Sequence, residues 1–400
     1  MNNNKMKVQI ISEQFRNEDG TLDKKRALLF GGLAAGICYD KEGFDHLKNE
    51  PEDVTMKRIS GTLDRGHHSP YGNISISFEI QNIPKILAMV LNNEREYNTC
   101  EKSARYTPIE RSEGSSITYD EARLYYKWLD LLKKKIQESY GEQFGKFKIR
   151  TLAQENARYF ISVFMPTSME YTTSFRQINY IASWMKKYIA NANLSDEFQK
   201  KLSSSMQDFL YCLEQLNVLE AGLMVNDKSR SISLFGKDLF QREIHFGDVY
   251  STKYYGSFAQ FAQAQRHRSL KYQLEMQDHP TFFVPPIIED NLFLVSEWLQ
   301  DMNRVKKNHP QGEMVLIHEA GTYDNFILKC MERLCSSAQL EISNQTRETL
   351  LRYKEALKKS NSYLADDIER HSHGARCTFP EYHCFSDCHF AEGKTLTRKI

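Results

Sequence analysis

The 400 residues of this chain are enough for two or three ordinary cores, and 40% hydrophobic with 26% charged residues is the composition of a water-soluble globular protein. No apolar run approaches the roughly 20 residues that cross a bilayer, and the first residues lack the apolar core of a signal peptide, so we expect a cytoplasmic protein without a membrane partner. A formal net charge of +1 gives no global reason to expect nucleic acid as a partner.

The first half of the chain is predicted to be rich in helices around a small sheet. Apolar stretches favour a helix over 26–38, and alternating apolar and polar residues predict a half-buried strand over 74–80. A helix over 84–93 then opens with a proline at a favourable first-turn position. Further helices are predicted over 119–140, 152–164, 180–192 and 195–216.

The order of elements begins again after a break. Between about residues 225 and 247 the periodicity is lost, which predicts a domain junction. A helical run over 257–265 then delivers Arg266-His267-Arg268, just as the helix over 84–93 delivers Asn93-Glu94-Arg95. The repeated order predicts an internal duplication.

Two short motifs stand out in the repeated parts. The first part carries Gly66-His67-His68-Ser69 and later Glu101-Lys102-Ser103-Ala104-Arg105-Tyr106, and the second carries Gln263-Ala264-Gln265-Arg266-His267-Arg268. Alone, an Arg-His-Arg tripeptide is more often solvated surface charge. Together and in this order, the motifs resemble the flavin-dependent thymidylate synthases (ThyX), whose signature Q-x-x-R-H-R-x-x-S-x-N-E-x-S-x-R-Y follows a G-H-x-S segment.

Each part keeps what the other has lost. Asn93 and Glu94 stand where the first part should have the Arg and His of the signature. In the second part, the Ser, Asn and Glu of the signature are replaced by Lys271, Gln273 and Leu274. The resemblance therefore implies fewer working sites than a standard family member has.

The expected fold class is α+β, with two tandem ThyX-like α/β copies that are helix-rich with small antiparallel or mixed sheets. We place the first copy at 1–225, the second at 245–355 and a Cys/His-rich C-terminal tail at 356–400. Ala338-Gln339-Leu340-Glu341-Ile342 matches the family's common A-Q-x-E-I ending, which is intact only in the second copy.

Arginine side chains suit bidentate phosphate contacts and stacking on planar rings, and they recur in these motifs. Carried over by position, the resemblance implies a nucleotide-binding set of Glu101, Ser103, Arg105, Gln263, Arg266 and Arg333. It implies a flavin-binding set of His67, Ser69, Arg266, His267 and Arg268. None of these roles needs a covalent nucleophile.

The resemblance implies an enzyme of nucleotide biosynthesis that methylates dUMP to dTMP. Family members use FAD, take the carbon from methylenetetrahydrofolate, and use NADPH to reduce the flavin that supplies the hydride. They are tetramers with sites where subunits meet, so a duplicated chain is expected to be a homodimer that forms a pseudo-tetramer. Two alternatives stay open: a relative acting on another pyrimidine nucleotide or one-carbon product, and a non-catalytic nucleotide-binding descendant.

The tail holds a separate group of metal-binding residue types. Cys377, Cys384 and Cys388 have C-x6-C-x3-C spacing, with His383 among the nearby imidazoles. This ligand set suits tetrahedral zinc, although the spacing is not that of a standard zinc finger. A redox or iron–sulfur role and ordinary packing remain the other interpretations.

Overall fold

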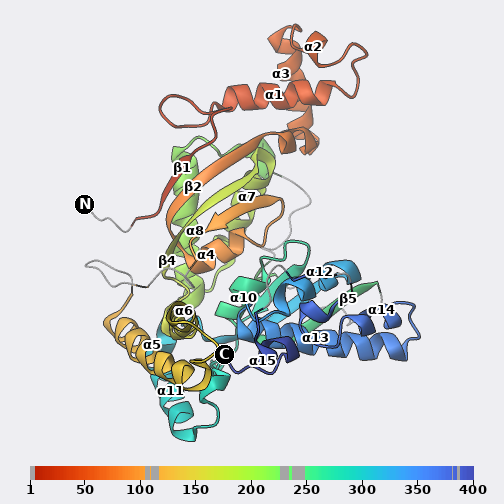
Figure 1. Ribbon diagram of the computed structural model, residues 1–400. Helices are drawn as coiled ribbons and strands as arrows, with labels where there is room; N and C mark the ends of the chain where they lie inside the picture. Colours follow the sequence, from red (N-terminus) through yellow and green to blue (C-terminus); the bar gives the residue numbers. More distant parts are fainter. Residues whose placement is uncertain are drawn as a thin grey trace. The chain divides into compact units, whose positions relative to one another are not determined.

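The computed structural model describes residues 5–103, 109, 117–225, 234–236, 248–380, 382–384 and 388–400 (Figure 1). It divides into two compact units: unit 1 comprises Met1–Lys102 and Pro166–Ile232, and unit 2 comprises Ser103–Met165 and Ser233–Ile400. Most of the expected junction at 225–247 lies outside the described residues. No helix within the described part of the chain is both long and apolar enough to span a bilayer.

The predicted helix-rich α+β class with small antiparallel sheets is confirmed. Unit 1 contains β1 (Lys7–Ile10), α1 (Lys24–Gly36), α2 (Phe44–Leu47), α3 (Glu52–Asp64), the 3-10 helix η1 (Ser69–Asn73), β2 (Ser75–Pro84), α4 (Lys85–Leu91), β3 (Tyr97–Glu101), β4 (Pro166–Ser174), α7 (Phe175–Asn191), α8 (Glu197–Gln215) and α9 (Ala221–Met224).

The sheet of unit 1 has the strand order β1-β2-β4-β3, and every neighbouring pair is antiparallel. The alternation predicted for β2 is present, because Ile76, Phe78 and Ile80 are buried between more exposed neighbours. The register with β4 shifts between Gln81 and Ile83, where Asn82 has a φ of 57°. Asparagine tolerates this left-handed conformation better than most residues, which suits it to a bulge.

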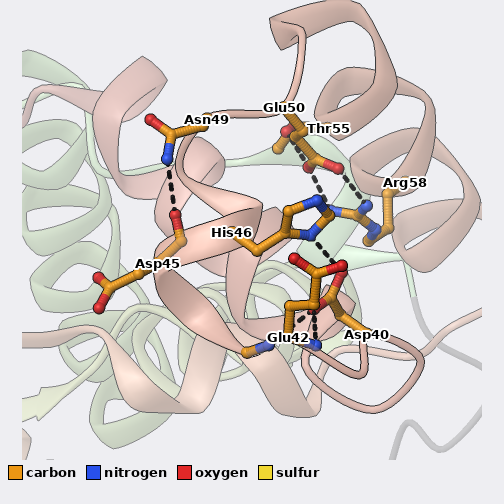
Figure 2. Close-up of polar contacts among 9 residues, drawn as sticks. Asp40, Glu42, Asp45, His46, Asn49, Glu50, Thr55 and Arg58 are labelled. Atoms are coloured by element: carbon orange, nitrogen blue, oxygen red, sulfur yellow. Dashed lines mark hydrogen bonds and ion pairs between the residues drawn. The ribbon is translucent and has the colours of Figure 1, made fainter.

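Two groups of polar contacts lie around α2 and α3 of unit 1 (Figure 2). Arg58 binds both carboxylate oxygens of Glu50, at 2.6 and 2.7 Å, and also donates to the carbonyl of Gly32 at 3.1 Å. The imidazole of His46 lies 2.8 Å from Asp40, and this hydrogen bond raises the pKa of His46. The bidentate pair ties α3 to the turn that precedes it, and the hydrogen bond to Gly32 ties α3 to α1, just ahead of the Gly66–Ser69 motif.

Unit 2 has a smaller sheet with the order β5-β7-β6, again antiparallel throughout. Its elements are α5 (Tyr119–Tyr140), α6 (Lys146–Ala157), η2 (Arg158–Phe160), β5 (Val249–Ser257), α10 (Phe258–Ala264), β6 (Lys271–Glu275), η3 (Pro286–Ile288), α11 (Leu292–Val305), η4 (Lys306–Asn308), β7 (Met314–Thr322), α12 (Tyr323–Arg333), α13 (Leu340–Lys359), α14 (Ala365–Arg370), η5 (Arg376–Thr378) and α15 (Ala391–Thr395).

The two sheets share a connection pattern. In unit 1, β2 leads directly into the short helix α4, then to β3, and β4 returns to pair between β2 and β3 before α7 begins. In unit 2, β5 leads into α10, then to β6, and β7 pairs between β5 and β6 before α12 begins. This common order is what a duplicated chain is expected to show, and the duplication itself remains a prediction.

An aromatic cluster forms the core of unit 2 between α5, η2 and α11. The ring centroid of Trp298 lies 4.8 Å from that of Trp128 and 4.6 Å from that of Phe160. Both indole N–H groups are satisfied: Trp128 donates to Asp301 at 3.0 Å and Trp298 to the carbonyl of Phe283 at 2.7 Å. Residues 103–165 of the expected first copy are therefore built into unit 2.

The helix predicted over 119–140 is confirmed, whereas the one predicted over 152–164 is displaced. Helix α6 ends at Ala157, and the chain after η2 is extended. The backbone of Ile161 accepts a hydrogen bond from Gln311 at 2.7 Å, and Val163 donates to His309 at 2.9 Å. Pairing with a segment about 150 residues away thus replaces the helical hydrogen bonds, which local periodicity cannot reveal.

We expect Trp298→Ala to lower the free energy of unfolding by about 3–5 kcal/mol, because it removes the ring at the centre of this cluster and leaves a cavity. Urea denaturation followed by circular dichroism measures the change. The control is Phe293→Ala on the same helix, whose side chain is 77% exposed and should matter by less than about 0.5 kcal/mol. Equal losses in the two variants would contradict the assignment of the core.

Candidate functional site

The predicted Arg-His-Arg motif follows the C-terminal end of α10 in unit 2. Ser257 caps the start of this helix by accepting a hydrogen bond from the backbone of Gln260. At the other end Arg266 and Arg268 are exposed, whereas His267 between them is buried. The motif therefore presents two guanidinium groups to solvent and turns its imidazole inward.

Arg333 at the end of α12 reaches this turn. Its Nε donates to Nε2 of His267 at 2.7 Å, and its Nη2 donates to the backbone carbonyl of Gln263 at 3.2 Å. Three of the predicted site residues, which lie up to 70 positions apart in the sequence, are thus brought together. The contact fixes the direction of the Arg333 guanidinium, which is a suitable donor for a phosphate or a pyrimidine carbonyl.

The imidazole of His267 is held in its neutral form. Burial lowers its pKa to about 2, and the nearby charges of Arg333 and Lys329 add to this effect. A neutral ring has one nitrogen that accepts, and here that nitrogen is Nε2, which faces Arg333. Because the ring is neutral, its weak 3.9 Å contact with Glu332 is not an ion pair. His267 therefore positions Arg333 and does not supply a charge.

A buried ion pair supports α12 one turn before Arg333. Lys329 lies 2.7 Å from Glu319 on β7, and both side chains are fully buried. Glu319 also accepts hydrogen bonds from the hydroxyls of Tyr250 and Tyr254 on β5, at 2.6 and 2.8 Å. Sequence reasoning missed this pair, although a lysine on the apolar face of an amphipathic helix was an available signal.

The A-Q-x-E-I segment fixes the start of α10. Glu341 accepts hydrogen bonds from the backbone N–H and the hydroxyl of Ser257, and from the hydroxyl of Tyr159 at 2.9 Å. Burial raises the pKa of this carboxyl group, and these hydrogen bonds oppose the rise. Gln339 donates to the same tyrosine hydroxyl at 2.8 Å. In this way the A-Q-x-E-I segment orients α10, the helix that leads to Arg266-His267-Arg268.

The first-copy residues of the predicted nucleotide set belong to other segments of the chain. Glu101 on β3 of unit 1 forms an ion pair with Lys85 and accepts from Asn92 at 3.4 Å. Ser103 is half-buried at the start of the first unit 2 segment, and Arg105 lies outside the described residues. Within unit 2, the structure brings together Gln263 and Arg333, two second-copy members of the predicted nucleotide set.

The Gly66–Ser69 motif of unit 1 places its two histidines differently. His67 and Ser69 are exposed, as ligand-binding side chains need to be, while His68 is buried. Nδ1 of His68 lies 3.0 Å from the hydroxyl of Tyr180 on α7. His68 thus has a structural role, and His67 and Ser69 are the members of the motif available for a cofactor.

The predicted tail ligands are only partly brought together. No three His, Cys, Asp or Glu side chains among the residues the structure describes are grouped so that they could hold one metal ion. Cys377, Cys384 and Cys388 nevertheless line the same cavity, and His383 is not among its lining residues.

The donor set at the end of α10 fits phosphorylated ligands. Arg266 and Arg268 are exposed, and Arg333 contacts His267, which lies between them in the sequence. Guanidinium groups are suited to the pyrophosphate of a dinucleotide or the phosphate of a nucleotide. The residues present therefore fit the phosphate groups of such ligands.

Comparison with known proteins supports the resemblance seen in the sequence. Residues 30–193 match the model of the Thy1 family, described as thymidylate synthase complementing protein, so the predicted family relationship is confirmed for that part of the chain. The match includes the Gly66–Ser69 motif and ends before Arg266. No curated protein matches the sequence.

Two solved structures of a UMP/dUMP methylase, PolB from Streptomyces cacaoi, are similar to parts of this chain. The complex with 5-Br dUMP shows 14% identity and a TM-score of 0.34, and the match covers 53% of this chain and 92% of that one. The complex with 5-Br UMP shows 14% identity and a TM-score of 0.31, with coverages of 55% and 93%. TM-scores this low do not establish a common fold.

We expect Lys329→Met to destabilise the protein by about 3–5 kcal/mol, because it leaves the Glu319 carboxylate buried without its cation. The double variant Lys329→Met/Glu319→Gln removes both charges and should recover part of the loss. Urea denaturation measures each change. Lys133→Met, which breaks an exposed pair with Asp130, is the control and should cost less than about 1 kcal/mol. A harmless Lys329→Met would refute the structural role of the pair.

The depressed pKa of His267 predicts a specific pH dependence. Unfolded, this histidine takes up a proton below its ordinary pKa of 6.5, but folded it stays neutral down to about 2. The stability that the neutral imidazole contributes is therefore present above pH 6.5 and is lost as the pH falls below it. Between pH 7 and 5, the wild type should lose about 2 kcal/mol more unfolding free energy than His267→Gln. Urea denaturation at each pH measures the unfolding free energy of both proteins. If the two free energies changed with pH by the same amount, His267 would not be buried as described.

Proposed function

We propose that this protein is a thymidylate synthase-like methyltransferase that uses FAD to convert dUMP to dTMP. Methylenetetrahydrofolate would be the carbon donor and NADPH the source of electrons. The proposal rests on one observation above all: Arg333, His267 and Gln263 meet at the turn that carries Arg266 and Arg268. The family match over 30–193 provides independent support from the other half of the sequence.

The roles we assign follow from exposure and contacts. Arg266 and Arg268 are exposed and would bind the phosphates of the dinucleotide. Arg333, oriented by His267, would bind the pyrimidine nucleotide, with Gln263 on the adjoining turn. Glu101, Ser103 and Arg105 would complete the nucleotide set, and His67 and Ser69 the flavin set. Bound flavin, once reduced, supplies the hydride, so the chain needs to bind and orient its ligands and needs no nucleophile of its own.

The proposed assembly is a homodimer in which the two copies of each chain form a pseudo-tetramer. The shared strand and helix order of the two sheets supports this duplication. The first-copy signature has lost its Arg and His at Asn93 and Glu94, so we expect fewer flavins than copies.

A decisive experiment measures the visible absorption of the purified protein after adding FAD, before and after dUMP. Arg268→Ala should weaken flavin binding by about 10- to 100-fold, because a hydrogen bond to a charged group contributes about 1.5–3 kcal/mol. Arg370→Ala, an exposed arginine on α14, is the matched control and should bind flavin as the wild type does.

The outcomes separate the candidate functions. Flavin bands that shift on adding dUMP, together with dTMP formed from methylenetetrahydrofolate and NADPH, are the expected result. Bands that shift only with another pyrimidine nucleotide would indicate a relative with a different substrate. Protein that takes up no flavin but still binds nucleotide would overturn the proposal in favour of a non-catalytic descendant.

A further inference from the structure

Four cysteines line one cavity in unit 2. Cys377, Cys384 and Cys388 come from the tail, and Cys335 comes from the turn between α12 and α13. The cavity has a volume of about 190 Å³. The fourth thiol lies 42 positions before Cys377, so the spacing of the tail cysteines gave no sign of it.

The tail is fastened to this turn on both sides of the cavity. The backbone of Arg376 donates to Leu334 at 2.7 Å, and its guanidinium donates to the carbonyl of Met331 at 3.1 Å. Gly393 packs so closely that a Cβ at this position would lie 2.7 Å from that of Ser336. Cys335 and the tail cysteines therefore face the same space because of specific backbone contacts.

Two basic side chains, those of Arg376 and Lys394, also line the cavity. Their positive charges can offset the negative charge of several metal-bound sulfurs.

We propose that this cavity binds a four-iron, four-sulfur cluster ligated by Cys335, Cys377, Cys384 and Cys388. Four thiolates are a ligand set that both zinc and iron–sulfur clusters accept, so the spacing of the thiols decides between them. The four cysteines line one cavity, yet no three His, Cys, Asp or Glu side chains among the described residues are grouped closely enough to hold a single ion. A four-iron cluster holds its cysteine sulfurs farther apart than a single ion does.

Binding requires only that each thiol lose its proton to solvent as its sulfur bonds to iron. The cluster joins the α12–α13 turn to the C-terminal segment and adds metal–sulfur bonds to the hydrogen bonds that Arg376 already makes there. The proposal does not depend on the proposed nucleotide chemistry, because it uses none of the residues assigned to flavin or dUMP.

The test is anaerobic reconstitution of the full chain with sulfide and equal amounts of ferrous and ferric iron, which match the oxidation level of the resting cluster and require no further oxidant. We expect about four iron and four acid-labile sulfide per chain, with the broad visible absorption of a cluster. Cys335→Ser and Cys388→Ser should each lose most of the iron, while circular dichroism verifies that they are folded. Cys38→Ser, an exposed cysteine of unit 1, and His383→Ala should bind iron as the wild type does.

Three results would overturn the proposal. One is binding of a single zinc ion per chain when zinc is offered in place of iron, with no cluster formed on reconstitution. Another is binding of neither metal. The third is a cluster that survives in Cys335→Ser but is lost in His383→Ala, which would assign the fourth ligand to the tail histidine.

Discussion

The buried pair of Lys329 and Glu319 is the interaction on which the candidate site depends. Two charges with no exposed surface are tolerated only with close partners, and the tyrosine hydroxyls of β5 satisfy the remaining carboxylate capacity. The pair therefore joins α12 to both β5 and β7. Arg333 follows one helical turn later on the same side of α12, so its position beside His267 is set by this anchor.

The residues of the Arg-His-Arg motif at the end of α10 differ in burial and in charge. The buried imidazole stays neutral and accepts from Arg333, whereas the side chains of the flanking Arg266 and Arg268 are exposed at the surface. In the proposed site, one residue orients a donor and two offer charge to a ligand. On that proposal, an Arg-His-Arg tripeptide, which by itself is most often solvated surface charge, becomes part of a binding site.

The compact units and the sequence copies are different divisions of the chain. Residues 103–165 lie in the expected first copy, yet Trp128 and Phe160 pack on Trp298 in unit 2. Large aromatic side chains contribute strongly to the stability of a core, whichever segments of the chain supply them. The two sheets nevertheless share one connection order.

The sequence by itself determined the α+β class, the helix over 119–140, the strand and helix leading to Asn93, and the helix leading to Arg266, because each has a periodicity readable within a short window. It also selected Gln263, His267 and Arg333 by resemblance. Only the tertiary structure decided that these three meet, that helix α6 stops at Ala157, and that Cys335 joins the tail cysteines. These outcomes depend on contacts between segments that are distant in the sequence, and on burial, which lowers the pKa of His267. Neither distant contacts nor burial leaves a pattern in the local sequence.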